Sequence, residues 1–162
     1  MQKDAAPING QIDPTEAEHA AMRDAIDRAL KAAKQSGKAG IAATVMREGK
    51  IIAVGENEVN LRCDPTKHAE MVAITRAAAA LNATDLSGCT ILSTLQPCEM
   101  CLSAIRFAGI SRIVFAARQA NVPQKYFAFP HLQIEDFLND DFVFAGGVGE
   151  SSVLHLYENG DE

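Results

Sequence analysis

The sequence lacks any long run of apolar residues. Its first twelve residues, MQKDAAPINGQI, hold no hydrophobic segment, and no later stretch approaches the length that a membrane-spanning helix needs. We therefore expect no signal peptide, no membrane partner and a soluble protein of the cytoplasm. The chain also lacks internal repeats and low-complexity segments, which excludes a repeat architecture.

Basic residues are scarce toward the C-terminus. Residues 119–162 contain one lysine, Lys125, and eight aspartates or glutamates, whereas the preceding residues carry nearly balanced charge. A protein that binds a polyanion needs a concentrated basic surface. We therefore expect bulk nucleic acid to be a poor partner.

Cysteines are few. In an intracellular chain, four such residues point to metal ligands, redox groups or core packing before a disulfide framework. A length of 162 residues with 48% apolar composition suits one well-packed domain. We expect a flexible arm over residues 1–12 and a single domain over residues 13–162, in which residues 119–162 form an acidic, divergent C-terminal segment.

Helix and strand patterns alternate along the chain. Asp13, followed by Pro14 and by Glu16 three residues on, indicates the start of an Ala-rich helix that ends near Gly37. This alternation predicts an α/β fold, a three-layer α/β/α sandwich around a mixed sheet of about five strands. The other expected elements are a hairpin over 41–55, a polar loop over 56–66, helices over 68–81 and 97–109, strands over 89–95 and 111–117, a short helix near 132–138, and apolar pieces at 142–147 and 151–158.

Two cysteines begin the later of the two central helices. In PCEMC, Cys98 and Cys101 are three residues apart, which places both sulfurs on one helix face, and Pro97 suits the first helical turn. The positive end of the helix dipole lowers the pKa of thiols at this position. The pair can therefore chelate one soft or borderline divalent cation, for which zinc is the natural choice.

A histidine and a glutamate begin the other helix. On a regular helix His68 and Glu70 would point about 200° apart, so they cannot share a lateral target. In the first turn, however, one of them can reach a metal ahead of the helix while the other stands beside it. We predict that His68, Cys98 and Cys101 bind one zinc ion per chain and that Glu70 does not bind it.

Three protein ligands plus water is the arrangement of a catalytic zinc site. Zinc lowers the pKa of its bound water toward neutrality, and Glu70 can accept the water's proton and deliver protons to a ring nitrogen and a departing amine. The predicted products are ammonia and a carbonyl compound.

A closed structural zinc site is the main alternative for these residues. In that reading Cys63, five residues before His68, supplies a fourth ligand, which would leave Glu70 without a role. Neither HAE nor CxxC alone is specific, and a lone CxxC also fits a redox site or half a zinc knuckle. We expect Cys63 to lie in a loop or the pocket lining, and Cys89 to lie in the core.

The two motifs together carry a family resemblance. HAE at 68–70 with PCEMC at 97–101 resembles the signature of the cytidine deaminase superfamily. The longer segments DPTKHAE and TLQPCEMC resemble those of tRNA adenosine deaminases and guanine deaminases, and the TL pair is also similar to fungal cytosine deaminase. The resemblance spans about residues 15–118. It implies a cytidine deaminase-like fold, a zinc-dependent hydrolase acting on C–N bonds of cyclic amidines, and a homodimer.

The resemblance also implies three substrate contacts. Asn57 matches a substrate-contacting asparagine, the backbone N–H of Ala69 would face the base, and the backbone carbonyl of Gln96 would accept the leaving amino group. The chain departs from the family in its first core strand, where GIAA at 40–43 replaces PFGA or PVGA. That segment shapes the floor of the pocket.

The substrate is expected to be an amino-substituted nucleobase-like ring, taken as a free base or nucleoside. Cytosine, guanine, adenine, pterin and triazine rings all remain open. The acidic segment 119–162 should lie near the mouth of the site and repel phosphate. One alternative is a tRNA adenosine deaminase acting on an anticodon loop, although the chain ends in YENGDE rather than a basic helix. The other is a non-catalytic, zinc-stabilised scaffold.

Three aromatic residues follow the strand at 111–117. We interpret each of Tyr126, Phe127 and Phe129 first as core packing, although a ring-binding enzyme needs an apolar wall for its substrate. Among the remaining histidines, His19 should be solvated, and His131 and His155 should lie at the surface or the pocket edge.

Overall fold

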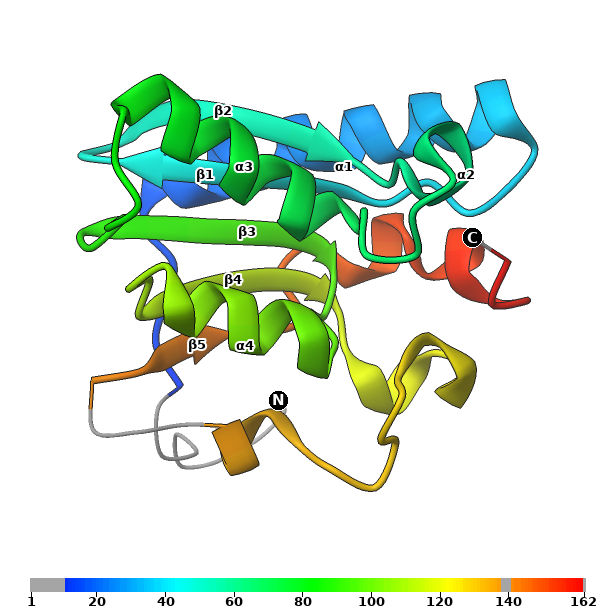
Figure 1. The fold of residues 1–162 in the computed structure, drawn as a ribbon. Helices are drawn as coiled ribbons and strands as arrows, with labels where there is room; N and C mark the ends of the chain where they lie inside the picture. The colour runs from blue at the N-terminus through cyan, green and yellow to red at the C-terminus, as the bar shows by residue number, and fades with distance from the viewer. Residues whose placement is uncertain (1–10, 138–140, 162) are drawn as a thin grey trace.

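A five-stranded mixed sheet forms the middle layer of the protein (Figure 1). The computed structural model describes residues 11–137 and 141–161. Its elements in chain order are α1 (Glu16–Ser36), β1 (Ala42–Arg47), β2 (Lys50–Glu56), α2 (Val59–Arg62), α3 (Ala69–Leu81), β3 (Cys89–Leu95), α4 (Glu99–Phe107), β4 (Arg112–Ala117) and β5 (Val143–Ala145). The predicted α/β sandwich is confirmed.

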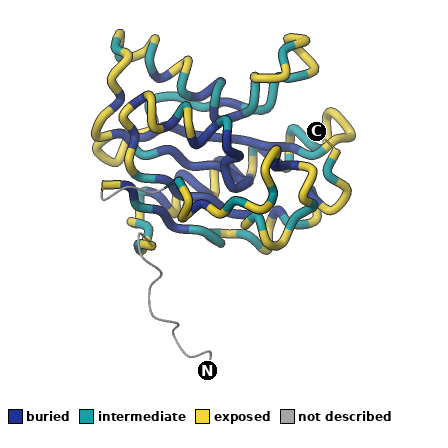
Figure 2. The backbone as a smooth tube through the Cα atoms, turned by 60° about the horizontal axis from the view of Figure 1, so that its bottom comes forward, coloured by how far each residue is buried: buried dark blue, intermediate teal, exposed yellow. Residues whose placement is uncertain are grey.

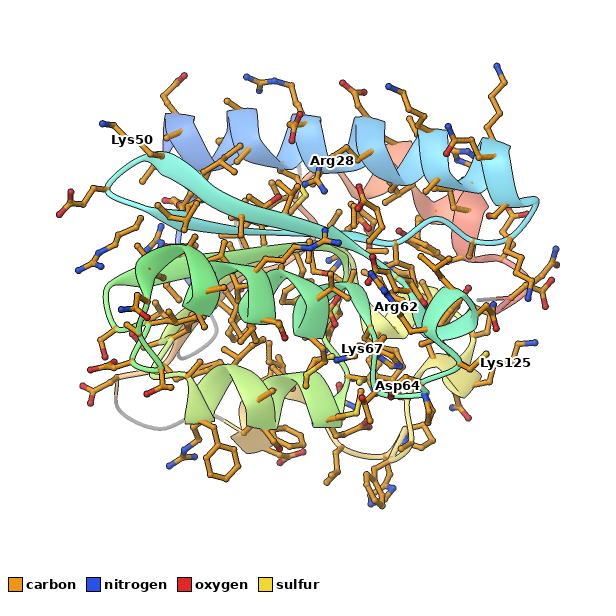
Figure 3. All side chains as sticks on the ribbon, turned by 45° about the horizontal axis from the view of Figure 1, so that its top comes forward. Arg28, Lys50, Arg62, Asp64, Lys67 and Lys125 are labelled. Atoms are coloured by element: carbon orange, nitrogen blue, oxygen red, sulfur yellow. The ribbon has the colours of Figure 1, made fainter. Side chains whose placement is uncertain are left out.

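The strand order in the sheet is β2-β1-β3-β4-β5. β1 pairs antiparallel with both β2 and β3, whereas β3, β4 and β5 are parallel. Helix α1 covers one face of the sheet, and α3 and α4 lie side by side on the other (Figure 3). β3 and β4 are buried almost throughout, as expected for strands covered on both faces, and the buried backbone runs through the middle of the molecule in Figure 2.

Helix α1 begins two residues later than the Asp13 signal predicted. Thr15 is the N-cap, because its hydroxyl accepts a hydrogen bond from the Glu18 backbone N–H while the Glu18 carboxylate accepts one from the Thr15 N–H. This reciprocal pair satisfies two backbone donors at the helix start. Asp13 lies before it, and its carbonyl accepts from Arg112.

The predicted hairpin is confirmed, and its turn places two residues at positive φ. Glu48 (φ 53°) and Gly49 (φ 76°) form the two-residue connection between β1 and β2. A second glycine brings α3 against the hairpin. A side chain at Gly55 would lie within 3 Å of the backbone at Ala69 and Ala73, so the start of α3 can approach β2 this closely only because residue 55 has none.

Two expectations for the connecting segments were incomplete. The polar loop predicted over 56–66 contains the one-turn helix α2. Pro97 lies before α4 rather than in its first turn, because Cys98 is the N-cap.

The C-terminal part adds β5, which pairs with β4. It also contains short 3₁₀ turns at Gln119–Asn121, Gln124–Tyr126, Ile134–Phe137, Glu150–Ser152 and Leu154–Tyr157.

Residues 11 and 12, the end of the expected N-terminal arm, lie against the sheet. Gln11 forms a parallel bridge with Phe144, and the Ile12 N–H donates to the Phe144 carbonyl at 2.8 Å. The rest of the expected arm lies outside the described residues. Within the described part of the chain, no helix is both long and apolar enough to cross a membrane.

Candidate metal centre and active site

The site lies where α3 and α4 begin. Both helices start at the end of the sheet to which the arrowheads of β3 and β4 point (Figure 1). In α/β folds this carboxyl edge of parallel strands is where ligands usually bind. Helix α4 follows β3 after only three residues, so its first turn is held directly at this edge.

His68, Cys98 and Cys101 meet there. The His68 Nδ1 lies 3.6 Å from the Cys98 Sγ and 3.7 Å from the Cys101 Sγ, and the three candidate ligand atoms all lie within 4.8 Å of one another. Tetrahedral zinc with ordinary Zn–N and Zn–S bonds requires an N···S separation of about 3.6 Å. The donor set and its spacing therefore fit a zinc ion without rearrangement.

A turn formed by residues 64–66 (DPT) holds His68 in this position. The Asp64 carboxylate accepts hydrogen bonds from the Thr66 N–H at 2.9 Å and the Thr66 hydroxyl at 2.6 Å, and these hydrogen bonds lower the pKa of Asp64. The His68 N–H then donates to the Thr66 carbonyl. This tight turn brings His68 in as the extended N-cap of α3 (φ −62°, ψ 156°), so its side chain lies ahead of the helix.

The two cysteines occupy the corresponding position on α4. Cys98 is the extended N-cap and Cys101 lies in the first turn, and both are buried. Hydrogen bonding from Cys101 and His68 lowers the pKa of Cys98 to about 4, whereas the bond to Cys98 and burial raise the pKa of Cys101 well above its usual range. One thiolate is thus already favoured at neutral pH at the positive end of α4.

Glu70 stands beside the ligand cluster and is 4% exposed. Its Oε1 accepts a hydrogen bond from the Ser93 hydroxyl at 2.7 Å. Burial, followed by the negative charge of Cys98, raises the pKa of this carboxyl. A raised pKa favours the protonated carboxyl, as a group that accepts and later delivers a proton requires.

A small pocket lies directly next to these groups. We call it the inner pocket; its volume is about 20 Å³, which is room for about one water molecule. Six of the seven residues singled out from the sequence line it, and the seventh, Cys101, lies behind it in the ligand cluster. The full lining is Ile41, Asn57, His68, Ala69, Glu70, Leu95, Gln96, Cys98 and Tyr126.

The three predicted substrate contacts are held in distinct ways. The Asn57 Oδ1 accepts the Val59 N–H at 2.9 Å, which fixes the amide through its acceptor end. Ala69 is the first residue of α3, where backbone N–H groups have no partner within the helix. The Gln96 side chain is engaged by Gln119, since its Oε1 accepts the Gln119 N–H at 2.9 Å. The predicted role of Gln96 concerned its backbone carbonyl, which this contact does not use.

A larger cavity of about 610 Å³ adjoins the inner pocket; we call it the outer cavity. His68, Cys98 and Tyr126 line both, so the two spaces meet at the metal ligands. Residues of the expected acidic segment do line the outer cavity, as predicted for its position. The charged residue among them is Lys125, however, and not an acidic one; its Nζ lies 4.0 Å from the Asp161 carboxylate.

The aromatic residues after β4 divide between core and cavity. Tyr126 and Phe127 are each 6% exposed and belong to the core, as predicted. Phe129 is 52% exposed and lines the outer cavity, so the core interpretation was wrong for this residue. His19, His131 and His155 are all exposed.

Two supporting residues were missed in the sequence. Ser93 is a buried serine in the strand CTILSTL, and Glu99 is a buried glutamate between the two cysteines. Glu99 accepts hydrogen bonds from the backbone N–H groups of Ala128 and Phe129 at 3.1 and 2.9 Å. A polar residue in a buried register could have indicated Ser93, but only the folded chain brings the partner of Glu99 into reach.

The closed four-ligand alternative does not match the geometry. Cys63 is exposed, and its thiol donates to the Asn60 carbonyl at 3.9 Å, while the ligand cluster found among the described residues contains only His68, Cys98 and Cys101. Cys89 is buried in the core, as predicted.

Comparison with known proteins gives consistent matches. Residues 15–117 match the family profile described as the cytidine and deoxycytidylate deaminase zinc-binding region. A tRNA-specific adenosine deaminase of Aquifex aeolicus is 40% identical over 90 residues, which cover 56% of this chain and 60% of that protein. The guanine deaminase of Bacillus subtilis is 36% identical over 106 residues, which cover 63% of this chain and 68% of that protein. The match thus spans less than two thirds of the Aquifex protein.

A solved structure shares the fold. A mutant form of NE0047, in complex with 8-azaguanine, superposes with a TM-score of 0.74 at 26% identity, covering 85% of this chain and 81% of that chain. The matched family profile is that of a zinc-binding region, and His68, Cys98 and Cys101 form the candidate metal site within it. The chain belongs to the family of the cytidine and deoxycytidylate deaminase zinc-binding region.

Proposed function

We propose that the chain is a zinc-dependent hydrolytic deaminase, which converts an amino-substituted nucleobase-like ring, as free base or nucleoside, to the carbonyl compound and ammonia. The observation that carries this proposal is the buried carboxylate of Glu70, which lies beside three ligand atoms and is not one of them. The test is ammonia release across a panel of amino-heterocycles by the zinc-loaded protein. Absence of ammonia from every ring in the panel would contradict the proposal.

In this proposal His68, Cys98 and Cys101 would hold the zinc, which would supply a water of lowered pKa. Glu70 is the group that would accept a proton and deliver it to a ring nitrogen, and burial raises the pKa of its carboxyl, which favours the protonated form. The Ser93 hydroxyl holds one carboxylate oxygen of Glu70, so the carboxylate is oriented before the substrate arrives.

The ring would be held by three groups of the inner pocket. The Asn57 amide, anchored at its oxygen by Val59, presents its Nδ2 to an acceptor on the ring. The Ala69 N–H contacts the base from the start of α3, and the Gln96 carbonyl accepts the departing amino group. The neighbouring NE0047 structure holds 8-azaguanine, which supports a flat ring of this class as ligand.

Replacing Asn57 by alanine should reduce kcat/KM by about 10²-fold. A polar edge of the substrate would be left unpaired in the pocket, which costs about 1–3 kcal/mol. The measurement is steady-state ammonia release with circular dichroism as a check on folding. The matched control is Asn60→Ala on the neighbouring helix α2, outside the inner pocket, which should stay within about threefold of the parent chain. Equal losses in both variants would argue against the role of Asn57.

A tRNA-acting deaminase is the second candidate. Arg62, Lys67 and Lys125 gather at the end of the molecule where α2 lies, whereas Lys50 lies at the opposite end (Figure 3). Acidic groups accompany these cations, however: the Arg62 Nε lies 3.5 Å from Glu58, and the Lys125 Nζ lies 4.0 Å from Asp161. Mixed charge of this kind favours a neutral small molecule over a phosphate backbone. Efficient deamination of an anticodon stem-loop, with no reaction of free bases or nucleosides, would favour the second candidate.

A homodimer is also part of the proposal. Partly or fully exposed apolar side chains recur at helical spacing on the two outer helices, namely Met71, Ile74 and Ala78 on α3 and Ala104 and Phe107 on α4. Phe107 is 92% exposed. Exposed apolar side chains on neighbouring helices are typical of a protein–protein contact.

Light scattering at micromolar concentration should give twice the 17.3 kDa mass of the chain. Phe107→Glu should shift the protein to the monomer, because a buried unpaired charge disfavours the contact. Ile51→Glu, at an exposed position on β2, should leave the dimer intact. A monomeric parent protein would contradict the dimer without affecting the proposed chemistry.

We further propose that residues 13–162 fold as one domain and that the protein acts in the cytoplasm. All four cysteines are free, as is usual in a reducing compartment. Limited proteolysis that leaves a stable fragment beginning near residue 13 would support the domain boundary.

A further inference from the structure

The inner pocket is far smaller than the cavity next to it. About 20 Å³ beside the ligands leaves room for little more than the reacting edge of a ring, so any substituent attached to that ring must extend into the outer cavity. Its volume of about 610 Å³ falls within the range of about 300–1,000 Å³ typical of sites for drug-sized ligands. A single free base would fill only a part of it.

The outer cavity has an apolar lining beyond the metal ligands. Most of the side chains around it are aromatic or aliphatic: Pro65, Met100, Tyr126, Ala128, Phe129, Leu132 and Phe137. Among the lining residues Lys125 is the only lysine or arginine, and its ammonium lies 4.0 Å from the Asp161 carboxylate. A phosphate group would therefore meet little positive charge here, whereas a flat apolar group would meet several rings.

The wall formed by residues 128–132 is held firmly at both ends. Glu99, which lies between the two cysteine ligands, accepts the backbone N–H groups of Ala128 and Phe129. The Gln119 amide donates to the carbonyls of Pro130 and Leu132 at 3.2 and 3.0 Å, and Gln119 is itself bonded to Gln96 of the inner pocket. The aromatic wall is thus fixed relative to the metal ligands, which is the preorganisation that a binding site requires.

Phe129 is placed to contact a ligand. Its ring is 52% exposed although it lines the outer cavity, and the edge-to-face contact with His131, at 6.4 Å between ring centroids, orients it. Covering such a ring with an apolar partner stabilises a complex by the hydrophobic effect and by ring stacking.

We propose that the outer cavity is a subsite for a second, uncharged aromatic group of the substrate. The preferred substrate is then an amino-heterocycle that carries an aryl substituent, with its amino-bearing edge at the zinc ligands and its aryl group against Phe129. This proposal rests on the proposed deaminase function. It extends that function from the reacting ring to the part of the substrate that does not react.

The test uses guanine, adenine and cytosine, each in three forms. These are the free base, the base with a benzyl group on a ring nitrogen and an unchanged amino group, and the nucleoside 5′-monophosphate. We expect the benzyl derivative of the reactive base to have a KM about tenfold lower than the free base, equivalent to about 1.4 kcal/mol, because the phenyl group is removed from water against an apolar wall. The monophosphate should show no such gain.

Phe129→Ala should abolish most of the benzyl advantage while the KM of the free base changes by less than about threefold. Leu132→Ala should act in the same direction. Ile51→Ala, an exposed apolar position on β2 away from both cavities, is the matched control and should keep the full advantage. Zinc content is measured in every variant, so that loss of metal is not mistaken for loss of the subsite.

A binding measurement separates this proposal from the proposed function. Calorimetric titration of the zinc-loaded Glu70→Ala protein with the same compounds reports affinity without turnover. The subsite is supported if the benzyl derivatives bind more tightly than the free bases to the Glu70→Ala protein, and if this difference is lost in the Glu70→Ala, Phe129→Ala double variant. This holds even where no compound is deaminated. Deamination of free bases with no gain in KM or affinity from the benzyl group overturns the subsite and leaves the function standing. Preference for the monophosphates overturns it as well.

Discussion

Glu70→Ala should abolish turnover while the protein keeps its zinc. We expect kcat to fall by about 10²–10⁴-fold, the usual contribution of a general acid–base group. The metal should remain because the ligand atoms of His68, Cys98 and Cys101 form a complete set of three without the carboxylate. Metal analysis and ammonia release on the same preparation test both parts of the prediction.

The control for this variant is Glu18→Gln. Glu18 is also a 4% exposed carboxylate, but it lies on α1 and pairs with Arg112, whose Nε lies 2.7 Å away. Its loss should lower stability without changing kcat. Two results would contradict the assignment of Glu70: zinc lost together with activity would make it a ligand, and unchanged activity would remove it from the reaction.

Cys101→Ser should lose both zinc and activity. Cys101 is fully buried, and its sulfur is one of the three ligand atoms within 4.8 Å of one another. Without the metal the pKa of water is no longer lowered toward neutrality, so activity should fall by at least about 10³-fold. Zinc content should fall from about one per chain to near zero.

Removal of zinc should also lower thermal stability. A metal present at 100 times its dissociation constant adds about 2.7 kcal/mol to the free energy of unfolding. For a chain of this length that corresponds to a shift in Tm of roughly 5–10 °C. A chelator should therefore lower the Tm of the parent protein by this amount. The Tm of the Cys101→Ser variant should not change when chelator is added. No effect of chelator on the parent Tm would contradict a resident metal.

The other two cysteines provide matched controls. Cys89→Ala removes a buried thiol from the core, and Cys63→Ser removes an exposed one close in sequence to His68. Both variants should keep about one zinc per chain and normal activity. If Cys63→Ser lost its zinc, the closed four-ligand site would replace the open one, and the proposed chemistry would no longer hold.

Much of the fold and most of the site could be predicted from the sequence because the signals are local. The hairpin follows from a turn that needs positive φ, and the alternation of helices and strands follows from hydrophobic spacing. The candidate metal ligands follow from CxxC at a helix start and from HAE, whose chemistry depends on residue type and spacing. The capping of α1 is equally local, but the Asp13 signal placed it two residues too early; the reciprocal pair of Thr15 and Glu18 caps the helix and satisfies two backbone donors at once.

Contacts between distant segments were decided only by the tertiary structure. Glu99 looked like an ordinary acidic residue in a first helical turn, yet it holds the backbone 29 and 30 residues further along the chain. Lys125, one cation in an acidic segment, lines the outer cavity, while net charge alone had predicted an acidic mouth. Phe129 carries the same apolar signal as Phe127 but lies in a cavity wall instead of the core. The sequence by itself determined which residues could bind metal and move protons, because that depends on chemical type and short spacing. The fold decided which surfaces surround them, because the packing of a C-terminal segment without strong periodicity depends on partners far away in the chain.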